Sequence, residues 1–131
     1  MSLEKERRFE AFAEFLAKFV VELNDASREG AAVLVEGKRD VRALTSLGYS
    51  GEIFTLADLS KQGTRERLRE HDRLLILTDL DSEGRRLASK YAKLLPGMGL
   101  KPSLAERRRL SAASKGVFLH VENLRRFARE T

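Results

Sequence analysis

The chain has 131 residues, no cysteine, two histidines and a net charge of +5, and 42% of its residues are hydrophobic. This composition excludes disulfides and thiolate metal sites and argues against a zinc centre. We expect a single domain over residues 1–131. No apolar run is long enough to cross a bilayer, so we also expect a cytoplasmic protein that does not bind a membrane.

The first thirty residues place apolar side chains at helical spacing, with mostly charged side chains between them. This pattern predicts an amphipathic helix of about 20 residues that ends between Asn24 and Gly30. We expect the helix to pack on the rest of the domain rather than on a partner. The residues at helical spacing are Phe9, Phe12, Leu16, Phe19, Val20 and Leu23, and Phe15 adds a fourth phenylalanine to the helix.

Residues 31–104 alternate between short apolar runs and helix-like segments. The expected strands are 31–35, 52–56, 73–78 and 100–104, and the expected helices are 38–47, 65–70 and 83–95. Thr64 is expected to cap the second of these helices, and Leu94 to face inward from the third. Pro102 would confine the last strand to a sheet edge. The alternation predicts an α/β fold in which helices cover both faces of a parallel sheet.

The C-terminal part is expected to form two basic helices, 105–114 and 121–129, within a segment 105–131 that packs on the core. Residues 99–131 carry 8 basic and 3 acidic side chains. Such an excess suggests contact with the phosphates of a polyanion. A solvated helix face is the commoner reason for arginine clusters alone. The densest run is Arg107, Arg108 and Arg109.

Three acids at alternate positions follow the apolar run of residues 74–77: Asp79, Asp81 and Glu83. In an extended chain, alternate side chains point the same way, and crowded carboxylates repel each other unless a cation joins them. Oxygen ligands of this kind suit Mg²⁺ or Mn²⁺. The alternative is a helix start, with Asp81 or Ser82 as the N-cap and Glu83 favoured by the helix dipole. That alternative does not explain Asp79.

A fourth acid, Glu36, ends the first predicted strand. In open α/β sheets, ligands bind beyond the carboxyl ends of the strands where the strand order reverses. If the first and third strands are neighbours there, Glu36 meets Asp79 and Asp81 in one crevice.

Two motifs carry a resemblance to a known family: V-E-G-K-R-D over residues 35–40 and I-L-T-D-L-D-S-E-G over residues 76–84. They closely resemble the Toprim domain of topoisomerases, bacterial primases and several nucleases, whose signature is Glu-Gly after the first strand and Asp-x-Asp after the third. The resemblance covers residues 31–104. It implies a Rossmann-like, four-stranded parallel sheet of order 2-1-3-4, a divalent metal (Mg²⁺ or Mn²⁺) and phosphodiester chemistry.

The resemblance implies that Glu36 is the general acid/base or a second-metal ligand. Asp79 and Asp81 would hold the metal, and Glu83 matches a third acid seen in type IA topoisomerases. Gly37 and Gly84 would let a phosphate approach the backbone, or else they are ordinary turn and helix-start glycines. The full set expected to contact phosphate is Gly37, Lys38, Arg39, Gly84, Arg85, Arg107, Arg108 and Arg109.

The Glu-Gly-x-x-Asp form of the first motif, ending at Asp40, is similar to the bacterial maturation nuclease of 5S ribosomal RNA. That enzyme carries a later Gly-Val-Glu-His segment, and His120-Val121-Glu122 matches it in part. Asp40 and Glu122 are therefore additional candidate acids, although Glu122 equally fits a helix cap. His120 is expected to be structural. Taken as a whole, the chain most resembles small stand-alone Toprim proteins with an added N-terminal helix.

Features that the chain lacks exclude some of the activities known in the family. We expect neither tyrosine of the chain, Tyr49 or Tyr91, to have a separate domain that could present it as the nucleophile of a topoisomerase, and without cysteines the chain has no primase zinc module. What remains is a metal-dependent nuclease or RNA-processing protein, with RNA favoured over DNA. The alternatives are a non-catalytic nucleic-acid-binding module within a larger protein complex, and a protein that binds a small phosphorylated ligand. We expect a monomer or a weak dimer.

Overall fold

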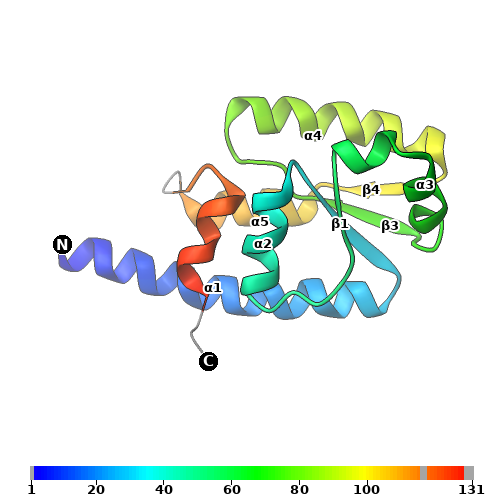
Figure 1. Ribbon diagram of the computed structural model, residues 1–131. Helices are drawn as coiled ribbons and strands as arrows, with labels where there is room; N and C mark the ends of the chain where they lie inside the picture. Colours follow the sequence, from blue (N-terminus) through cyan, green and yellow to red (C-terminus); the bar gives the residue numbers. More distant parts are fainter. Residues whose placement is uncertain (1, 116–117, 129–131) are drawn as a thin grey trace.

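A four-stranded parallel sheet forms the centre of the computed structural model, which describes residues 2–115 and 118–128 (Figure 1). The strands are β1 (Ala31–Val35), β2 (Ile53–Thr55), β3 (Arg73–Ile76) and β4 (Lys101–Ser103). Their order is β2-β1-β3-β4, as predicted. β1 pairs with β3 from Ala31 opposite Arg73 to Leu34 opposite Ile76. The carboxyl ends of these two strands therefore lie side by side.

Both faces of β1 are buried, which explains its uninterrupted apolar sequence. Val33 and Val35 join the core on one side of the sheet, whereas Ala32 and Leu34 join the core on the other. Pro102 lies in β4, which is an edge strand of the sheet and pairs with β3. An edge strand tolerates proline because one side of its backbone needs no donor.

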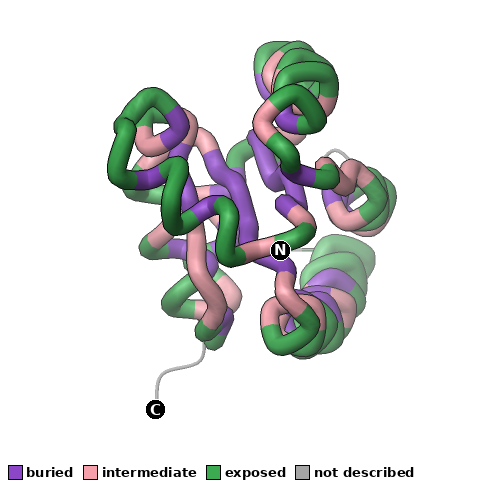
Figure 2. Tube along the Cα trace, turned by 90° about the vertical axis from the view of Figure 1, so that its right-hand side faces the viewer, coloured by how far each residue is buried: buried purple, intermediate pink, exposed green. Residues whose placement is uncertain are grey.

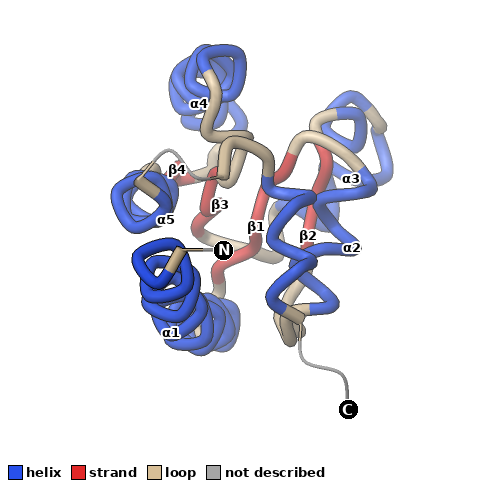
Figure 3. Tube along the Cα trace, turned by 90° about the vertical axis from the view of Figure 1, so that its left-hand side faces the viewer, coloured by secondary structure: helices blue, strands red, loops and turns tan. Residues whose placement is uncertain are grey.

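Helices cover both faces of the sheet, as Figures 2 and 3 show with the buried strands between exposed helices. One core is closed by α1 (Leu3–Arg28), α2 (Lys38–Ser46), α5 (Ala105–Ser114) and the 3₁₀ helix η3 (Val121–Phe127). The other is closed by η1 (Ala57–Ser60), α3 (Gln62–Leu68), α4 (Ser82–Leu94) and η2 (Leu95–Met98). Among the described residues, no helix is long and apolar enough to cross a membrane.

Helix α1 has 26 residues and is longer than predicted, because Ser2 caps its first turn by accepting a hydrogen bond from the Lys5 N–H (3.2 Å). Phe12 and Phe19 are buried against the sheet, as expected. Phe9 is 45% exposed, and residues 2–11 are all exposed. The first turns of α1 therefore extend past the body of the protein (Figure 1).

Three local predictions were wrong. Helix α3 begins at Gln62, so Thr64 is buried within it rather than capping it. Leu94 of α4 is 50% exposed, because the face that packs on the sheet runs through Gly84 and Ala88 to Leu95 just beyond the helix. The last helix is a 3₁₀ helix over Val121–Phe127 rather than an α-helix, and its predicted end at residue 129 is outside the described residues.

Candidate metal centre

The carboxyl ends of β1 and β3 bring Glu36 and Asp79 together. The backbone N–H of Asp79 donates a hydrogen bond of 2.6 Å to Oε2 of Glu36, although the two residues are 43 positions apart. This contact follows from the strand order, because neighbouring parallel strands deliver their next residues to the same edge.

Asp81 acts as the N-cap of α4, since its Oδ1 accepts a hydrogen bond of 2.7 Å from the Gly84 N–H. Capping uses one oxygen, and the other, Oδ2, lies 3.7 Å from Nδ1 of His120. The cap and a place in the acidic cluster are therefore compatible at this residue.

Gly84 is required by the loop itself. A Cβ at this position would lie 1.8 Å from the carbonyl oxygen of Asp79. The carbonyl of Gly84 also accepts a hydrogen bond of 2.6 Å from Thr78 Oγ1. Gly37 differs, because a Cβ there would meet nothing within 4 Å. Close packing within the protein thus accounts for Gly84 without any bound phosphate.

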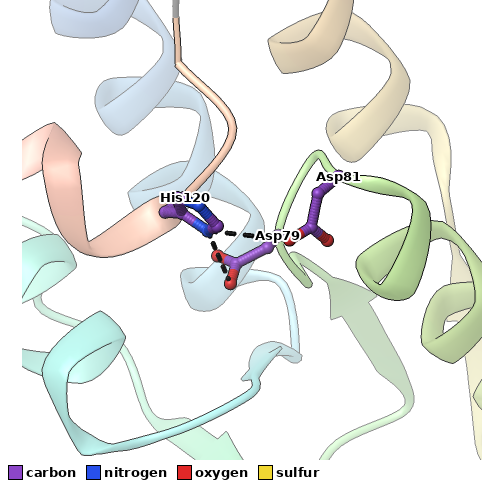
Figure 4. A group of neighbouring side chains, drawn as sticks. All are labelled: Asp79, Asp81 and His120. Carbon is purple, nitrogen blue, oxygen red and sulfur yellow. Dashed lines mark hydrogen bonds and ion pairs between the residues drawn. The ribbon is translucent and has the colours of Figure 1, made fainter.

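His120 completes the cluster, although the sequence led us to treat it as structural. Its Nδ1 lies 3.4 Å from Oδ2 of Asp79. One ligand atom from each of Asp79, Asp81 and His120 lies within 4.8 Å of the other two (Figure 4). The partial match at His120-Val121-Glu122 was the available sequence signal, but it does not show where the imidazole lies.

Backbone hydrogen bonds hold the segment around His120 against the loop after β3. The Val121 N–H donates to Oδ1 of Asp79 (2.7 Å), and the Leu80 N–H donates to the carbonyl of Leu119 (2.6 Å). These two bonds hold the backbone on both sides of His120 close to the carboxylates.

Arg107 also holds the loop after β3 in place. It is only 9% exposed, and its guanidinium donates hydrogen bonds to Thr78 Oγ1 (3.1 Å) and to the carbonyl of Asp79 (2.6 Å). The expectation that Arg107, Arg108 and Arg109 form one phosphate-binding run is therefore wrong. Consecutive helix residues are about 100° apart, so the three cannot share a face. Arg108 is exposed, and Arg109 pairs with Glu22.

The other candidate acids have partners outside the group of three. Asp40 is buried, and its Oδ2 accepts a hydrogen bond of 3.0 Å from the Gly37 N–H at the start of α2. Glu122 lies 3.8 Å from Arg39, and the exposed Glu83 pairs with Arg86 at 2.6 Å. The remaining basic candidates, Lys38 and Arg85, are exposed near the starts of α2 and α4.

Three ionisable groups in and around the cluster have shifted pKa values. Burial and the charge of Asp79 raise the pKa of Glu36 above its ordinary value, despite the hydrogen bond from the Asp79 N–H. Burial and the charges of Asp79 and Glu122 also raise the pKa of Asp40. The hydrogen bond to Asp79 raises the pKa of His120. Among the described residues, Arg107 is the one buried cation.

This donor set fits a divalent cation. Carboxylate oxygens suit Mg²⁺ and Mn²⁺, and an imidazole nitrogen favours a transition metal. An added positive ion would also favour the charged form of Glu36, whose pKa is raised by burial and by the charge of Asp79.

The comparisons with known proteins agree with the fold. A family model described as "Toprim domain" matches residues 30–106. The chain therefore belongs to the Toprim-domain family, whose members bind divalent metals through acidic residues and have functions related to nucleic acids.

Among curated proteins, the chain is similar to UPF0292 proteins of archaea. It is 38% identical to one from Pyrococcus horikoshii over 124 residues, which cover 95% of this chain and 86% of the relative. It is 36% identical to one from Methanosarcina barkeri over 119 residues, covering 90% and 80%. Among solved structures, it is similar to a putative protein from Aquifex aeolicus, with a TM-score of 0.66 and 29% identity over 81% of this chain and 94% of that chain.

Proposed function

We propose that the protein is a nuclease that hydrolyses phosphodiester bonds with Mg²⁺ or Mn²⁺ and acts on RNA in preference to DNA. The observation that carries the proposal is the contact between Glu36 and Asp79 at the carboxyl edge of two neighbouring strands. Ligands of open α/β sheets bind at this edge. A half-buried glutamate beside a metal-type cluster, with a pKa above its ordinary value, is suited to proton transfer.

Each residue has a separate role in this proposal. Asp79 and Asp81 would hold the cation, and His120 would add a nitrogen ligand. When bound, a divalent ion makes a water more acidic and stabilises negative charge on the phosphate oxygens. Glu36 is held through Oε2 by the Asp79 N–H, so its Oε1 takes the proton of the attacking water. The same oxygen then returns the proton to the oxygen that leaves phosphorus.

Substrate positioning is assigned to the surrounding basic groups. Helices α2 and α4 both begin at the cluster, and helix N-termini favour anions. Lys38, Arg39 and Arg85 are exposed near these ends and are proposed to contact phosphates of the substrate. Arg107 is a positioning residue, because its hydrogen bonds hold the carbonyl of Asp79.

A cleavage assay tests the proposal. Labelled structured RNA and DNA are incubated with Mg²⁺ or Mn²⁺ and with wild type, Asp79→Asn or Asp81→Asn. Asparagine is itself a good N-cap, so Asp81→Asn removes the charge and keeps the start of α4 intact. We expect each substitution to slow cleavage by at least about 100-fold, since even partners behind a metal ligand are worth about 10- to 100-fold.

The matched control is Asp25→Asn, which removes a carboxylate that is exposed and paired with Arg28 on α1. It should cleave at the wild-type rate. Equal cleavage by wild type and Asp79→Asn would contradict the proposal. Salt-sensitive binding by wild type without turnover would instead establish a non-catalytic module, of the kind that acts within a larger complex.

A further inference from the structure

A groove with an aromatic floor and basic walls lies beside the acidic cluster and outside the family match at residues 30–106. It runs between the N-terminal half of α1 and the C-terminal end of α5, and its volume is about 880 Å³. Phe12, Phe15 and Phe118 line it, and Phe9 stands at its side. Its charged side chains, five basic and one acidic, are Glu4, Lys5, Arg7, Arg8, Lys115 and Arg126.

The groove lies on the same side of the sheet edge as the acids. The 26 residues of α1 span about 39 Å at 1.5 Å per residue, far more than the short strand β1 that follows. Because α1 ends beside the amino end of β1, its first turns extend beyond the carboxyl edge (Figure 1).

A short segment links the two places. Phe118 contributes to the groove, the carbonyl of Leu119 accepts a hydrogen bond from the loop after β3, and His120 faces Asp79. A polymer held at the acids therefore needs to pass only this segment to reach the groove.

The chemistry of the groove matches a single strand of nucleic acid. Such strands bind where basic side chains follow the backbone and aromatic rings stack on the bases. Phe9 offers a ring that is 45% exposed and is braced from behind by Phe127, with 4.5 Å between ring centroids. A duplex hides the faces of its bases, so it would meet only the basic walls. A two-fold dimer through the groove would set the same basic walls against each other.

We propose that this groove binds a single-stranded segment of the nucleic acid whose phosphodiester bond lies at the acidic cluster. The inference rests on the proposed function and adds a substrate class to it. It also assigns a role to the first three turns of α1, which are otherwise exposed.

Binding is measured without turnover, by fluorescence anisotropy of a labelled single-stranded RNA with the full chain in EDTA. The test variant carries Lys5→Glu and Arg126→Glu, which reverse two exposed charges of the groove. The control carries Arg69→Glu and Lys93→Glu, which make the same change in net charge on exposed positions of the other helical layer.

We expect the groove variant to bind at least about 10-fold more weakly than the control. Its logarithmic salt dependence should be less steep by about 0.7 for each phosphate that the groove no longer neutralises. Equal binding by the two double variants would contradict the proposal that the groove binds the single strand, and it would not contradict the proposed nuclease activity.

The aromatic part is tested with Phe9→Leu, which keeps an apolar side chain against Phe127 and removes the flat ring. We expect binding of the single strand to weaken about 5- to 100-fold, with binding of duplex RNA unchanged. Thermal unfolding should match wild type, which would show that the loss is not a folding defect. An unchanged affinity for the single strand would overturn base stacking at Phe9 and with it the groove as proposed.

Two further outcomes distinguish binding of a single strand in the groove from dimerisation and from catalysis. Sedimentation that shows a dimer, dissociated by the groove substitutions, would make a second copy the occupant and overturn the proposal. Wild type that binds the single strand through the groove but cleaves nothing would support the groove and contradict the nuclease. The two proposals can therefore fail independently.

Discussion

Two glutamates lie at opposite ends of the parallel strands, one at the amino edge of the sheet and one at the carboxyl edge, and their pKa values are shifted in opposite directions. At the amino edge, Glu52 precedes β2 and contacts His71 (2.7 Å) and Arg67 (2.5 Å). Burial disfavours its charge, but the hydrogen bonds from these two partners outweigh burial and lower its pKa. At the carboxyl edge, burial and the charge of Asp79 raise the pKa of Glu36.

The two pKa shifts distinguish a glutamate that has a cationic partner, Glu52, from one that has mainly negative neighbours, Glu36. Glu52 pairs with the guanidinium of Arg67 and contacts the imidazole of His71, so its charge has a cation within the protein and its role is structural. Glu36 has mainly negative neighbours, and such an arrangement is typical of a site that awaits a cation or moves a proton. The direction of a pKa shift is therefore informative only together with the neighbouring groups that cause it.

The largest effect on stability is expected at Gly84, where the acidic edge is packed most tightly. Gly84→Ala would force a Cβ into the carbonyl of Asp79, so we expect a loss of about 3 kcal/mol in the free energy of unfolding. Gly63→Ala is the control, because a Cβ there meets nothing, and we expect it to change stability by no more than about 1 kcal/mol, in the stabilising direction. Urea unfolding measures both, and equal stabilities would contradict the packing at this edge.

Arg107 should show the next largest effect. Arg107→Met keeps most of the buried volume and leaves the carbonyl of Asp79 and the hydroxyl of Thr78 without their donor. We expect a loss of about 2 kcal/mol. Arg108→Met, at an exposed neighbouring position, should stay within about 0.5 kcal/mol of wild type. If both variants unfold alike, Arg107 does not support the loop.

The two glutamates should give the smallest effects, with opposite signs. The folded-state pKa of Glu36 lies above its ordinary 4.5, so its ionisation lowers stability as pH rises through that range. The pKa of Glu52 lies below 4.5, so its contribution is present above that pH and is lost as pH falls.

In metal-free protein at pH 7, Glu36→Gln should therefore raise the free energy of unfolding and Glu52→Gln should lower it. Each change should be below about 1 kcal/mol, because water screens partly exposed groups. The difference between wild type and Glu36→Gln should shrink as pH falls toward 4.5, whereas the difference for Glu52→Gln should shrink only as pH falls below 4.5. Changes of the same sign at pH 7 would refute the contrast between the two edges.

The sheet could be predicted because its signals are local. The run 31–35 is apolar at every position, which is typical of a strand buried on both faces, and Pro102 marks an edge. Once the order 2-1-3-4 was inferred from the family resemblance, the meeting of Glu36 with Asp79 followed from topology.

The missed features depend on the direction of side chains that arrive from distant segments. His120 lies beside Asp79 although the two are 41 positions apart, and the hydrogen bond that holds its segment there leaves no periodic signal in the sequence. Arg107 belongs to a run of three arginines in the sequence, but because of the helical pitch of α5 it is the one of the three that faces the protein interior. Charge in a sequence does not indicate whether a side chain faces solvent or supports a loop.

Titration of metal-free protein with Mn²⁺, in which calorimetry measures the heat of binding, tests most directly whether the acidic edge is a cation site. We expect wild type and Glu52→Gln to bind the ion equally, since the amino-edge glutamate already has its partners. Asp79→Asn should bind at least about 10-fold more weakly. Binding of Mn²⁺ to Asp79→Asn with the wild-type affinity would show that the carboxyl edge does not hold the cation.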